Sequence, residues 1–205
     1  MPFDINQYLQ RGLVYGGART SKFDVNLTIP TNVLSSDSAT IDPASQDKLT
    51  FTCVAASIPS FQIGEVQLPY FGRKIKSAGD RVWSNWRISV QIDEDYATRA
   101  MFEAWNNALN RIESNVLQGN LANESYKASW FITRYGRDNS IIRKYEVIGG
   151  WPKTVGPITL DWAGTDKVSE FEVEVCFDNF IPTPDGEQTS KSSSTVYGPS
   201  VDALN

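Results

Sequence analysis

The feature that most constrains the fold is a two-residue alternation of apolar and polar side chains in several segments. It is strictest in residues 169–178, S-E-F-E-V-E-V-C-F-D, and it recurs in residues 21–30 and 82–92. Alternation with this period places all the apolar side chains on one face of a half-buried β-strand. The predicted core residues are Phe23, Val25, Leu27 and Ile29 in the first strand, Trp86, Ile88, Val90 and Ile92 in the second, and Phe171, Val173, Val175 and Phe177 in the last.

Weaker patterns predict the remaining extended segments. Residues 48–56 alternate as a further strand, and residues 128–148 predict a hairpin around the turn sequence G-R-D-N. Residues 57–81 are interrupted by Pro and Gly, which predicts short extended pieces joined by turns. The glycines and the proline at 149–152 are expected to end the hairpin, and T-L-D-W at 159–162 to resume a strand.

One segment changes period and predicts a helix over residues 95–118. Its apolar side chains recur at steps of three and four, which is typical of an amphipathic helix: Phe102, Trp105, Leu109, Ile112 and Val116. Asp93 and Asp95 are candidate N-caps, and Gly119 is a plausible end.

These patterns together predict a mainly β fold, an antiparallel β-sandwich or barrel of about seven strands with one flanking α-helix. The 205 residues are enough for one substantial domain, which we expect at residues 21–182. Residues 1–20 are predicted to form an N-terminal arm, residues 31–47 a polar loop within the domain, and residues 183–205 a polar C-terminal extension.

Composition excludes much catalytic machinery, and we expect no cofactor. The absence of histidine rules out His-based triads and His-ligated metal sites. Cys53 and Cys176 lie in apolar strand-like segments, where we expect buried thiols. A net charge of −5 argues against a DNA-binding module, because that binding requires Lys and Arg to neutralise phosphates. No apolar run approaches the roughly 20 residues of a transmembrane helix, so we expect no stable membrane insertion.

Two groups of acids remain as candidate sites. Asp93, Glu94 and Asp95 could supply the carboxylates of a sugar hydrolase built on a β-sandwich, although a helix-capping cluster is the simpler interpretation. The last strand carries a row of acids opposite its core residues: Glu170, Glu172, Glu174 and Asp178. Such a row could bind a hard cation, lie in solvent, or form the wall of a water-filled channel.

Residues 71–82, F-G-R-K-I-K-S-A-G-D-R-V, concentrate positive charge in an acidic chain. The segment could bind phosphate, form a solvated turn, or contact another acidic copy of the same chain. The apolar residues among its cations favour contact with another copy. The residues that we assign to such a contact are Phe71, Arg73, Lys74, Ile75, Lys76, Asp80 and Arg81.

Two long blocks stand in the order that is typical of one known family. Residues 72–90 read G-R-K-I-K-S-A-G-D-R-V-W-S-N-W-R-I-S-V, and residues 148–162 read I-G-G-W-P-K-T-V-G-P-I-T-L-D-W. They resemble the R-K-I-x-x-A-G-D-R loop with its Trp-bearing strand, and the G-x-W-P-x-x-V-G-x-x-x-L-D-W segment, of the tail tube proteins of contractile-tailed bacteriophages. The helix with an internal Trp105, the hairpin and the closing strand also follow in the family's order, and the likeness extends over about residues 20–182.

The resemblance implies a structural virion protein without catalytic activity or cofactor. Members of that family form a small β-barrel or sandwich with a flanking helix, and six copies close into a ring. Stacked rings form the inner tail tube, with the sheath protein outside and the tape measure protein and then genome DNA in the lumen. Baseplate and tail terminator proteins would lie at the ends of the tube. We therefore expect the protein in the virion tail, assembled in the host cytoplasm.

The resemblance also suggests roles for the two charged segments. The basic segment would lie where rings or neighbouring subunits meet, with its cations paired to carboxylates of the next copy. The acidic row would face the lumen, where negative charge keeps DNA from adhering. The arm, the 31–47 loop and the residues after Pro182 depart from the family's compact form. A baseplate tube initiator or the tube subunit of a contractile injection system is the alternative function.

Overall fold

The computed structural model describes residues 5, 8, 17–34, 44–116 and 125–183. Three predictions therefore lie wholly or partly outside the described residues. They are the arm at 1–20, of which residues 5, 8 and 17–20 are described, the middle of the 31–47 loop, and the C-terminal extension beyond residue 183. The predicted helix end at Gly119 lies outside them as well.

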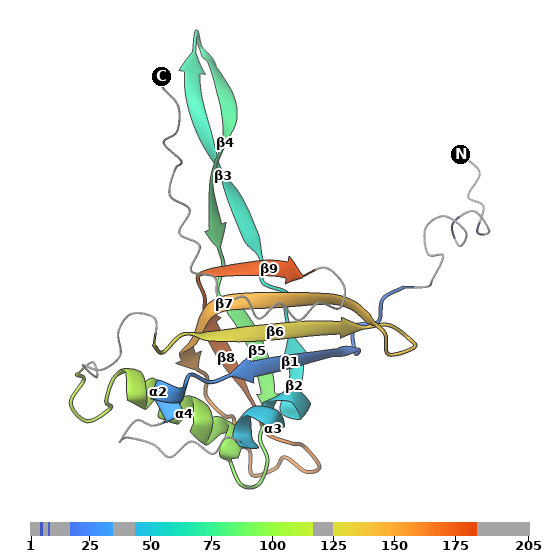
Figure 1. The fold of residues 1–205 in the computed structure, drawn as a ribbon, viewed down its shortest axis with the longest axis vertical. Coiled ribbons are helices and arrows are strands. Elements are labelled where there is room, and N and C mark those ends of the chain that lie inside the picture. Colours follow the sequence, from blue (N-terminus) through green and yellow to red (C-terminus); the bar gives the residue numbers. More distant parts are fainter. Residues whose placement is uncertain (1–4, 6–7, 9–16, 35–43, 117–124, 184–205) are drawn as a thin grey trace, which may run out of the picture.

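Nine strands and three helices occur in the described parts of the chain (Figure 1). The strands are β1 (Phe23–Thr28), β2 (Cys53–Ala56), β3 (Phe61–Tyr70), β4 (Arg73–Trp83), β5 (Trp86–Gln91), β6 (Ala128–Tyr135), β7 (Ile141–Val155), β8 (Glu170–Cys176) and β9 (Asn179–Thr183). The helices are α2 (Thr31–Leu34), α3 (Ala44–Thr52) and α4 (Ala97–Leu109). The mainly β, antiparallel fold class is confirmed, with more short elements than the sequence patterns predicted.

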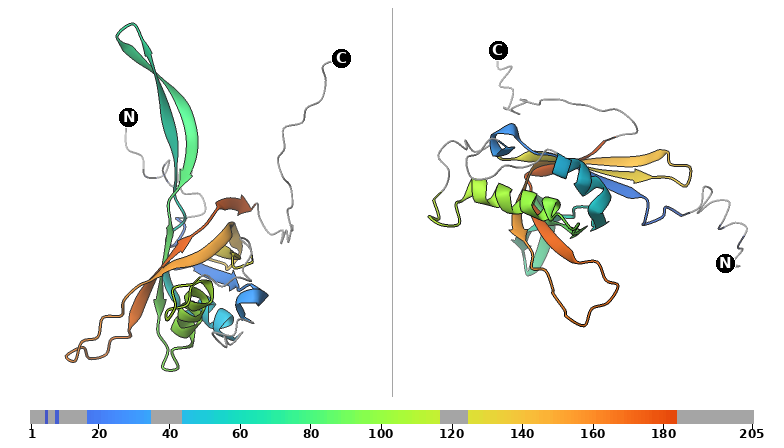
Figure 2. Two further views of the ribbon diagram at one scale, coloured as in Figure 1. Left: turned by 90° about the vertical axis from the view of Figure 1, so that its left-hand side faces the viewer. Right: turned by 90° about the horizontal axis from the view of Figure 1, so that it is seen from below.

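Strand β7 belongs to two sheets at once. Its first part pairs with β6 on one side and β9 on the other, and β1 follows beyond β6. Its last part, from Trp151 to Val155, pairs with β8, which is followed by β5 and β2. The described strands thus form sandwich-like sheets and no closed barrel. Strands β3 and β4 form a separate two-stranded sheet that projects far from this body (Figures 1 and 2).

The core lies where the alternation predicted it. Most predicted core positions are buried, while Phe23 and Ile92 are only partly buried; the buried ones in β1, β5 and β8 are Val25, Leu27, Trp86, Ile88, Val90, Phe171, Val173 and Val175. Trp130 of β6 lies at the centre, with Trp86 edge-on at 5.5 Å between ring centroids and Phe102 and Trp105 of α4 stacked at 6.2 Å. Close aromatic packing of this kind adds to the free energy of apolar burial.

The expected break at residues 149–152 is wrong, because β7 continues through it to Val155. Gly149 adopts a φ of +70°, which a residue with a side chain rarely adopts. A Cβ at Gly150 would lie 2.6 Å from Cδ1 of Trp130, so the missing side chain makes room for the central indole. The two glycines therefore carry the strand across the core instead of ending it.

Helix α4 is shorter than the predicted 95–118 segment. Phe102 and Trp105 are buried as predicted, but the backbone turns extended at Asn110, and Ile112 is 83% exposed. The N-cap is Tyr96, with a φ of 56° and no side-chain cap bond, so the N-cap prediction for Asp93 and Asp95 is wrong. Asp95 nevertheless accepts a hydrogen bond of 3.0 Å from the Ala97 amide in the first turn.

Three other local predictions are also wrong. Residues 44–52 form α3, with Leu49 buried and Phe51 exposed, so only the end of the expected 48–56 strand is extended and the 31–47 segment is not all loop. Residues 57–81 form most of one long hairpin instead of short pieces. Residues 159–162 lie in the loop between β7 and β8 and are not a strand. Among the described helices, none is both long and apolar enough to cross a membrane.

Candidate assembly interface

The projecting hairpin of β3 and β4 carries all seven residues of the predicted contact. Its two-residue turn is Phe71-Gly72, and both residues have positive φ, 42° and 77°. Positive φ at both positions characterises the hairpin turn whose twist matches the strands. A bulky residue in that conformation is unusual and costs about 1–3 kcal/mol. Phe71 is 92% exposed, and its ring packs edge-on against Tyr70 at 4.8 Å between centroids, a contact between neighbours at the tip.

The outer half of the hairpin has one apolar face and one polar face. Residues directly opposite in an antiparallel ladder share a face. The pairs Tyr70–Arg73, Leu68–Ile75 and Val66–Ser77 therefore form one face, and Pro69–Lys74, Gln67–Lys76 and Glu65–Ala78 form the other. On the apolar face, Val66, Leu68, Tyr70 and Ile75 are each about half exposed. Such a stripe on a two-stranded sheet has no core of its own, which is typical of a docking surface.

A β-bulge separates this outer half from the base of the hairpin. The register runs from Ile63–Arg81 to Glu65–Ala78, so Gly79 and Asp80 together oppose Gly64. A Cβ at Gly79 would lie 3.1 Å from the backbone of Gly64, so the strands approach closely at this point. A bulge of this kind increases strand twist. The extra residue lies on β4, whereas on β3 Phe61 and Ile63 face one way and Val66 and Leu68 the other, so the apolar side of the hairpin changes at the bulge.

The base of the hairpin is anchored to the body by aromatic side chains. Trp83 lies 5.1 Å from Phe180 and 6.2 Å from Phe177, between ring centroids, and Phe61 lies 5.7 Å from Trp83. The Arg81 guanidinium lies 4.5 Å from the Phe61 ring centroid. This arrangement fixes the direction in which the hairpin projects. Arg81 thus makes a contact within its own chain.

The other predicted contact residues lie farther out along β4. Lys76 forms a 2.9 Å ion pair with Glu65 across the hairpin, and because both side chains are largely exposed the pair contributes little to stability. Arg73, Lys74 and Ile75 lie near the tip, and Asp80 lies in the bulge. The structure thus brings the tip residues together on one projection and adds an apolar face that the sequence interpretation missed.

The acidic row is only partly continuous. Glu170, Glu172 and Glu174 lie on β8, on the face opposite its buried residues. Arg87 of β5 lies 3.8 Å from Glu172 and 3.4 Å from Glu174, and Lys153 of β7 lies 3.9 Å from Glu174. Asp178 follows the strand and pairs with Lys127 at 2.6 Å, so it stands apart from the other three.

Glu174 is the most tightly held acid of this row. Asn85 donates a 2.5 Å hydrogen bond to it, and this bond, with the nearby Arg87 and Lys153, lowers the pKa of the Glu174 carboxyl. Glu174 therefore remains ionised, and the cations of the two neighbouring strands offset the charge of the acids beside them.

The Asp93–Asp95 cluster is structural. Lys48 of α3 pairs with Asp93 at 3.0 Å and also with Asp95, which ties α3 to the start of α4. The hydrogen bond from Lys48 is the main cause that lowers the pKa of Asp95 to about 2. Lys48 thus pairs with both carboxylates and holds Asp95 ionised, whereas a hydrolase needs one carboxyl to stay protonated as the acid.

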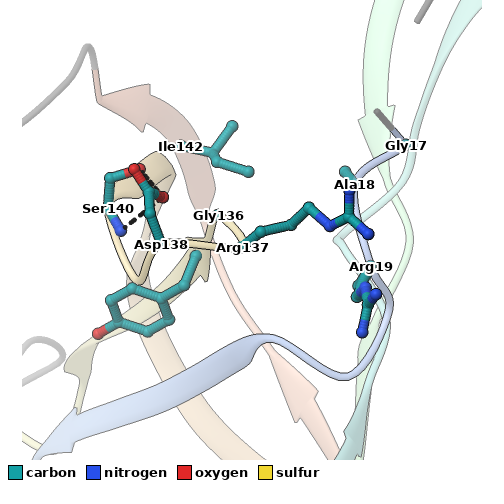
Figure 3. Close-up of a pocket in the computed structure, with 9 residues that line it drawn as sticks. Gly17, Ala18, Arg19, Gly136, Arg137, Asp138, Ser140 and Ile142 are labelled. Atoms are coloured by element: carbon teal, nitrogen blue, oxygen red, sulfur yellow. Dashed lines mark hydrogen bonds between the residues drawn. The ribbon is translucent and has the colours of Figure 1, made fainter. Parts of the chain in front are cut away.

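A separate hollow of about 520 Å³ lies between residues 17–19 and the β6–β7 turn (Figure 3). Arg137 extends from the turn toward residues 17–19, and Arg134 donates a 3.1 Å hydrogen bond to the Arg19 carbonyl. Within the turn, the Ser140 hydroxyl donates to Asp138 at 2.6 Å and lowers the pKa of that carboxyl. The segment before β1 and the β6–β7 turn therefore line the same hollow.

Solved structures share this fold. The anti-feeding prophage baseplate matches with a TM-score of 0.56 and 14% identity, over 82% of this chain and 95% of that one. The sheath/tube terminator of an extracellular contractile injection system, PVC, matches with a TM-score of 0.56 and 13% identity, over 83% of this chain and 99% of that one. The fold is therefore one that occurs in components of contractile injection systems.

Sequence comparison is more specific. The family model described as phage tail tube protein matches residues 18–183. The tail tube proteins gp19 of Enterobacteria phages T6 and T4 are each 32% identical over 130 residues, which cover 63% of this chain and 78% of each relative. The tail tube protein of Serratia phage KSP90 is 21% identical over 160 residues, 78% of this chain and 85% of that protein. The chain belongs to the phage tail tube protein family, whose members are structural proteins and not enzymes.

Proposed function

We propose that six copies of this chain close into a ring and that the rings stack into the inner tube of a contractile phage tail. The observation that carries the proposal is the amphipathic hairpin, whose apolar outer face has no partner among the described residues. A projection of this length can reach a neighbouring subunit in the same ring or in the next one. Residues 21–182 supply the tube-forming domain.

The apolar face and the cations have different roles in that contact. Burial of Val66, Leu68, Tyr70 and Ile75 supplies the free energy of docking. The cations Arg73 and Lys74 meet carboxylates of the acidic neighbour and fix the register, since charged rims affect specificity more than affinity. Phe71 at the strained tip enters the neighbouring subunit first.

The solvent face of β8 forms part of the lumen wall in this proposal. Genome DNA passes through the tube during ejection, and the tape measure protein occupies it before that. Glu170 and Glu172 repel phosphate, while Arg87 and Lys153 keep the wall from carrying an uncompensated charge. The sheath protein surrounds the tube, baseplate and terminator proteins close its ends, and assembly takes place in the host cytoplasm.

Electron microscopy of the purified protein tests this proposal. We expect rings and stacked tubes in negative stain, and six-fold averages in images along the tube axis. A particle that remains monomeric at every concentration would refute the self-assembly on which the proposal rests. Single rings that never stack would instead favour a tube initiator.

A further inference from the structure

The loop that joins β7 to β8 presents a second apolar projection. Trp162 is 105% exposed and Leu160 is 78% exposed, whereas an unpartnered Trp is rare on a soluble surface. The loop reaches away from the sheets at a different place from the β3–β4 hairpin (Figure 2). The hairpin contact proposed above therefore does not explain it.

A tight turn holds Trp162 outward. The Gly164 amide donates a 3.1 Å hydrogen bond to the Asp161 carbonyl, and the Ala163 amide donates one of 3.0 Å to the Asp161 carboxylate. These bonds place Trp162 at the corner of a β-turn, a position whose side chain points to solvent. The base of the loop is tied to β8 by the 2.7 Å bond from the Gly156 amide to the Glu172 carbonyl.

A groove of about 430 Å³ lies at the other side of the body, where α4 ends. Its apolar walls are Leu109 and Ile112 on one side and Trp151 and Pro152 on the other. Contacts within the chain hold both walls of the groove in place. The Asn115 amide donates a 2.8 Å hydrogen bond to the Arg111 carbonyl, and Tyr126 packs edge-on against Trp151 at 6.1 Å between ring centroids.

The charges of the loop and the groove are complementary. Asp161 adjoins Trp162 on the loop, with Asp166 and Lys167 farther along, and Arg111 lies beside the apolar walls of the groove, where Lys153 pairs with Glu174 of its own chain. The loop and the end of α4 lie on different sides of the same chain (Figures 1 and 2), so the loop does not fill the groove of its own copy. A contact between two different surfaces of identical chains repeats from copy to copy and closes into a ring or a helix.

We propose that Trp162 of one copy inserts into the Leu109–Ile112–Trp151 groove of the next copy. An ion pair between Asp161 of the loop and Arg111 beside the groove orients the insertion. The inference rests on the proposed self-assembly and names a contact between copies that is separate from the hairpin.

The first test is Trp162→Ala, with assembly followed by sedimentation velocity. Because Trp162 touches little of its own chain, the melting temperature should stay unchanged, while the concentration needed for assembly should rise at least about tenfold, as for a buried Trp hot spot. Asp161→Lys should weaken assembly, and adding Arg111→Glu should restore part of it. Assembly of Trp162→Ala at the wild-type concentration would overturn the inference and leave the tube proposal intact.

The second test is a disulfide between copies. In a Cys176→Ser background that keeps Trp162, Ala163→Cys beside it with Ile112→Cys should give a ladder of cross-linked multimers under mild oxidation. The matched control replaces Ile112→Cys with Phe51→Cys, which introduces an equally exposed thiol on α3. A ladder no stronger than that of the control overturns the contact, whereas wild-type protein that forms no assembly at all refutes the tube proposal instead.

Discussion

Replacing the cross-strand pair Leu68 and Ile75 with serine tests the apolar face of the hairpin. Full burial of such a side chain contributes about 1.5–3 kcal/mol. Leu68 is 52% exposed and Ile75 is 51% exposed, so docking can bury about half of each, or roughly 1 kcal/mol per side chain. The double substitution should therefore weaken each hairpin contact by about 2 kcal/mol, close to 30-fold in its dissociation constant.

The monomer should tolerate the same change, because these two side chains contact each other and not the core. The lost cross-strand pair costs less than about 1 kcal/mol. We expect a nearly unchanged melting temperature by circular dichroism and a large loss of tubes by electron microscopy and pelleting. The matched control, Gln67→Ser with Ala78→Ser, changes the polar face of the same two strands and should assemble normally. If the Leu68/Ile75 variant assembled at the concentration of the control, the apolar face would have no part in docking.

Three further outcomes are expected. Arg73→Glu with Lys74→Glu should weaken tube formation in low salt and leave the monomer folded, as measured by pelleting and thermal melts; a tube length distribution equal to the wild type would exclude a role for the tip cations. Glu170→Gln with Glu172→Gln should leave tubes intact and slow DNA ejection from phage that carry the change; normal infection kinetics would remove these residues from the lumen wall. The pKa of Asp95, about 2, lies below its ordinary value near 3.8, so the stability from its pair with Lys48 is present above about pH 4 and lost as the pH falls toward 2. Lys48→Met should flatten that part of the pH profile of the melting temperature, and an unchanged slope would contradict the assignment.

The alternation in the sequence predicted the core because a half-buried strand has no other way to separate its apolar and polar side chains. It predicted Val25, Trp86 and Val173 correctly for that reason. The same signal failed for residues 48–52, because so short an alternating pattern is also compatible with a turn of helix. These residues belong to α3, which buries Leu49. Contacts distant in the sequence decide such short segments.

The charge of residues 71–82 made the segment a candidate interface, but the sequence did not predict the long hairpin or its apolar face. Arg73, Lys74 and Ile75 were visible in the sequence because cations are unusual in this acidic chain. Phe61 and Ile63 lie on the other face of β3 from Val66 and Leu68, so two short alternations of opposite phase stood in one segment and neither predicted a continuous strand. The ion pairs that offset the acidic row come from β5 and β7, and only the pairing of the strands brings them together.

The passage of β7 through both sheets has a mechanical consequence. A slip of one residue in its pairing with β6 would carry Trp151 and Pro152 along by the same step, and every side chain on both ladders would change sides. Neither ladder can therefore change its register unless the other changes as well. A subunit of this kind should unfold in a single transition, and a pull applied to one sheet within a polymer is shared by the whole body.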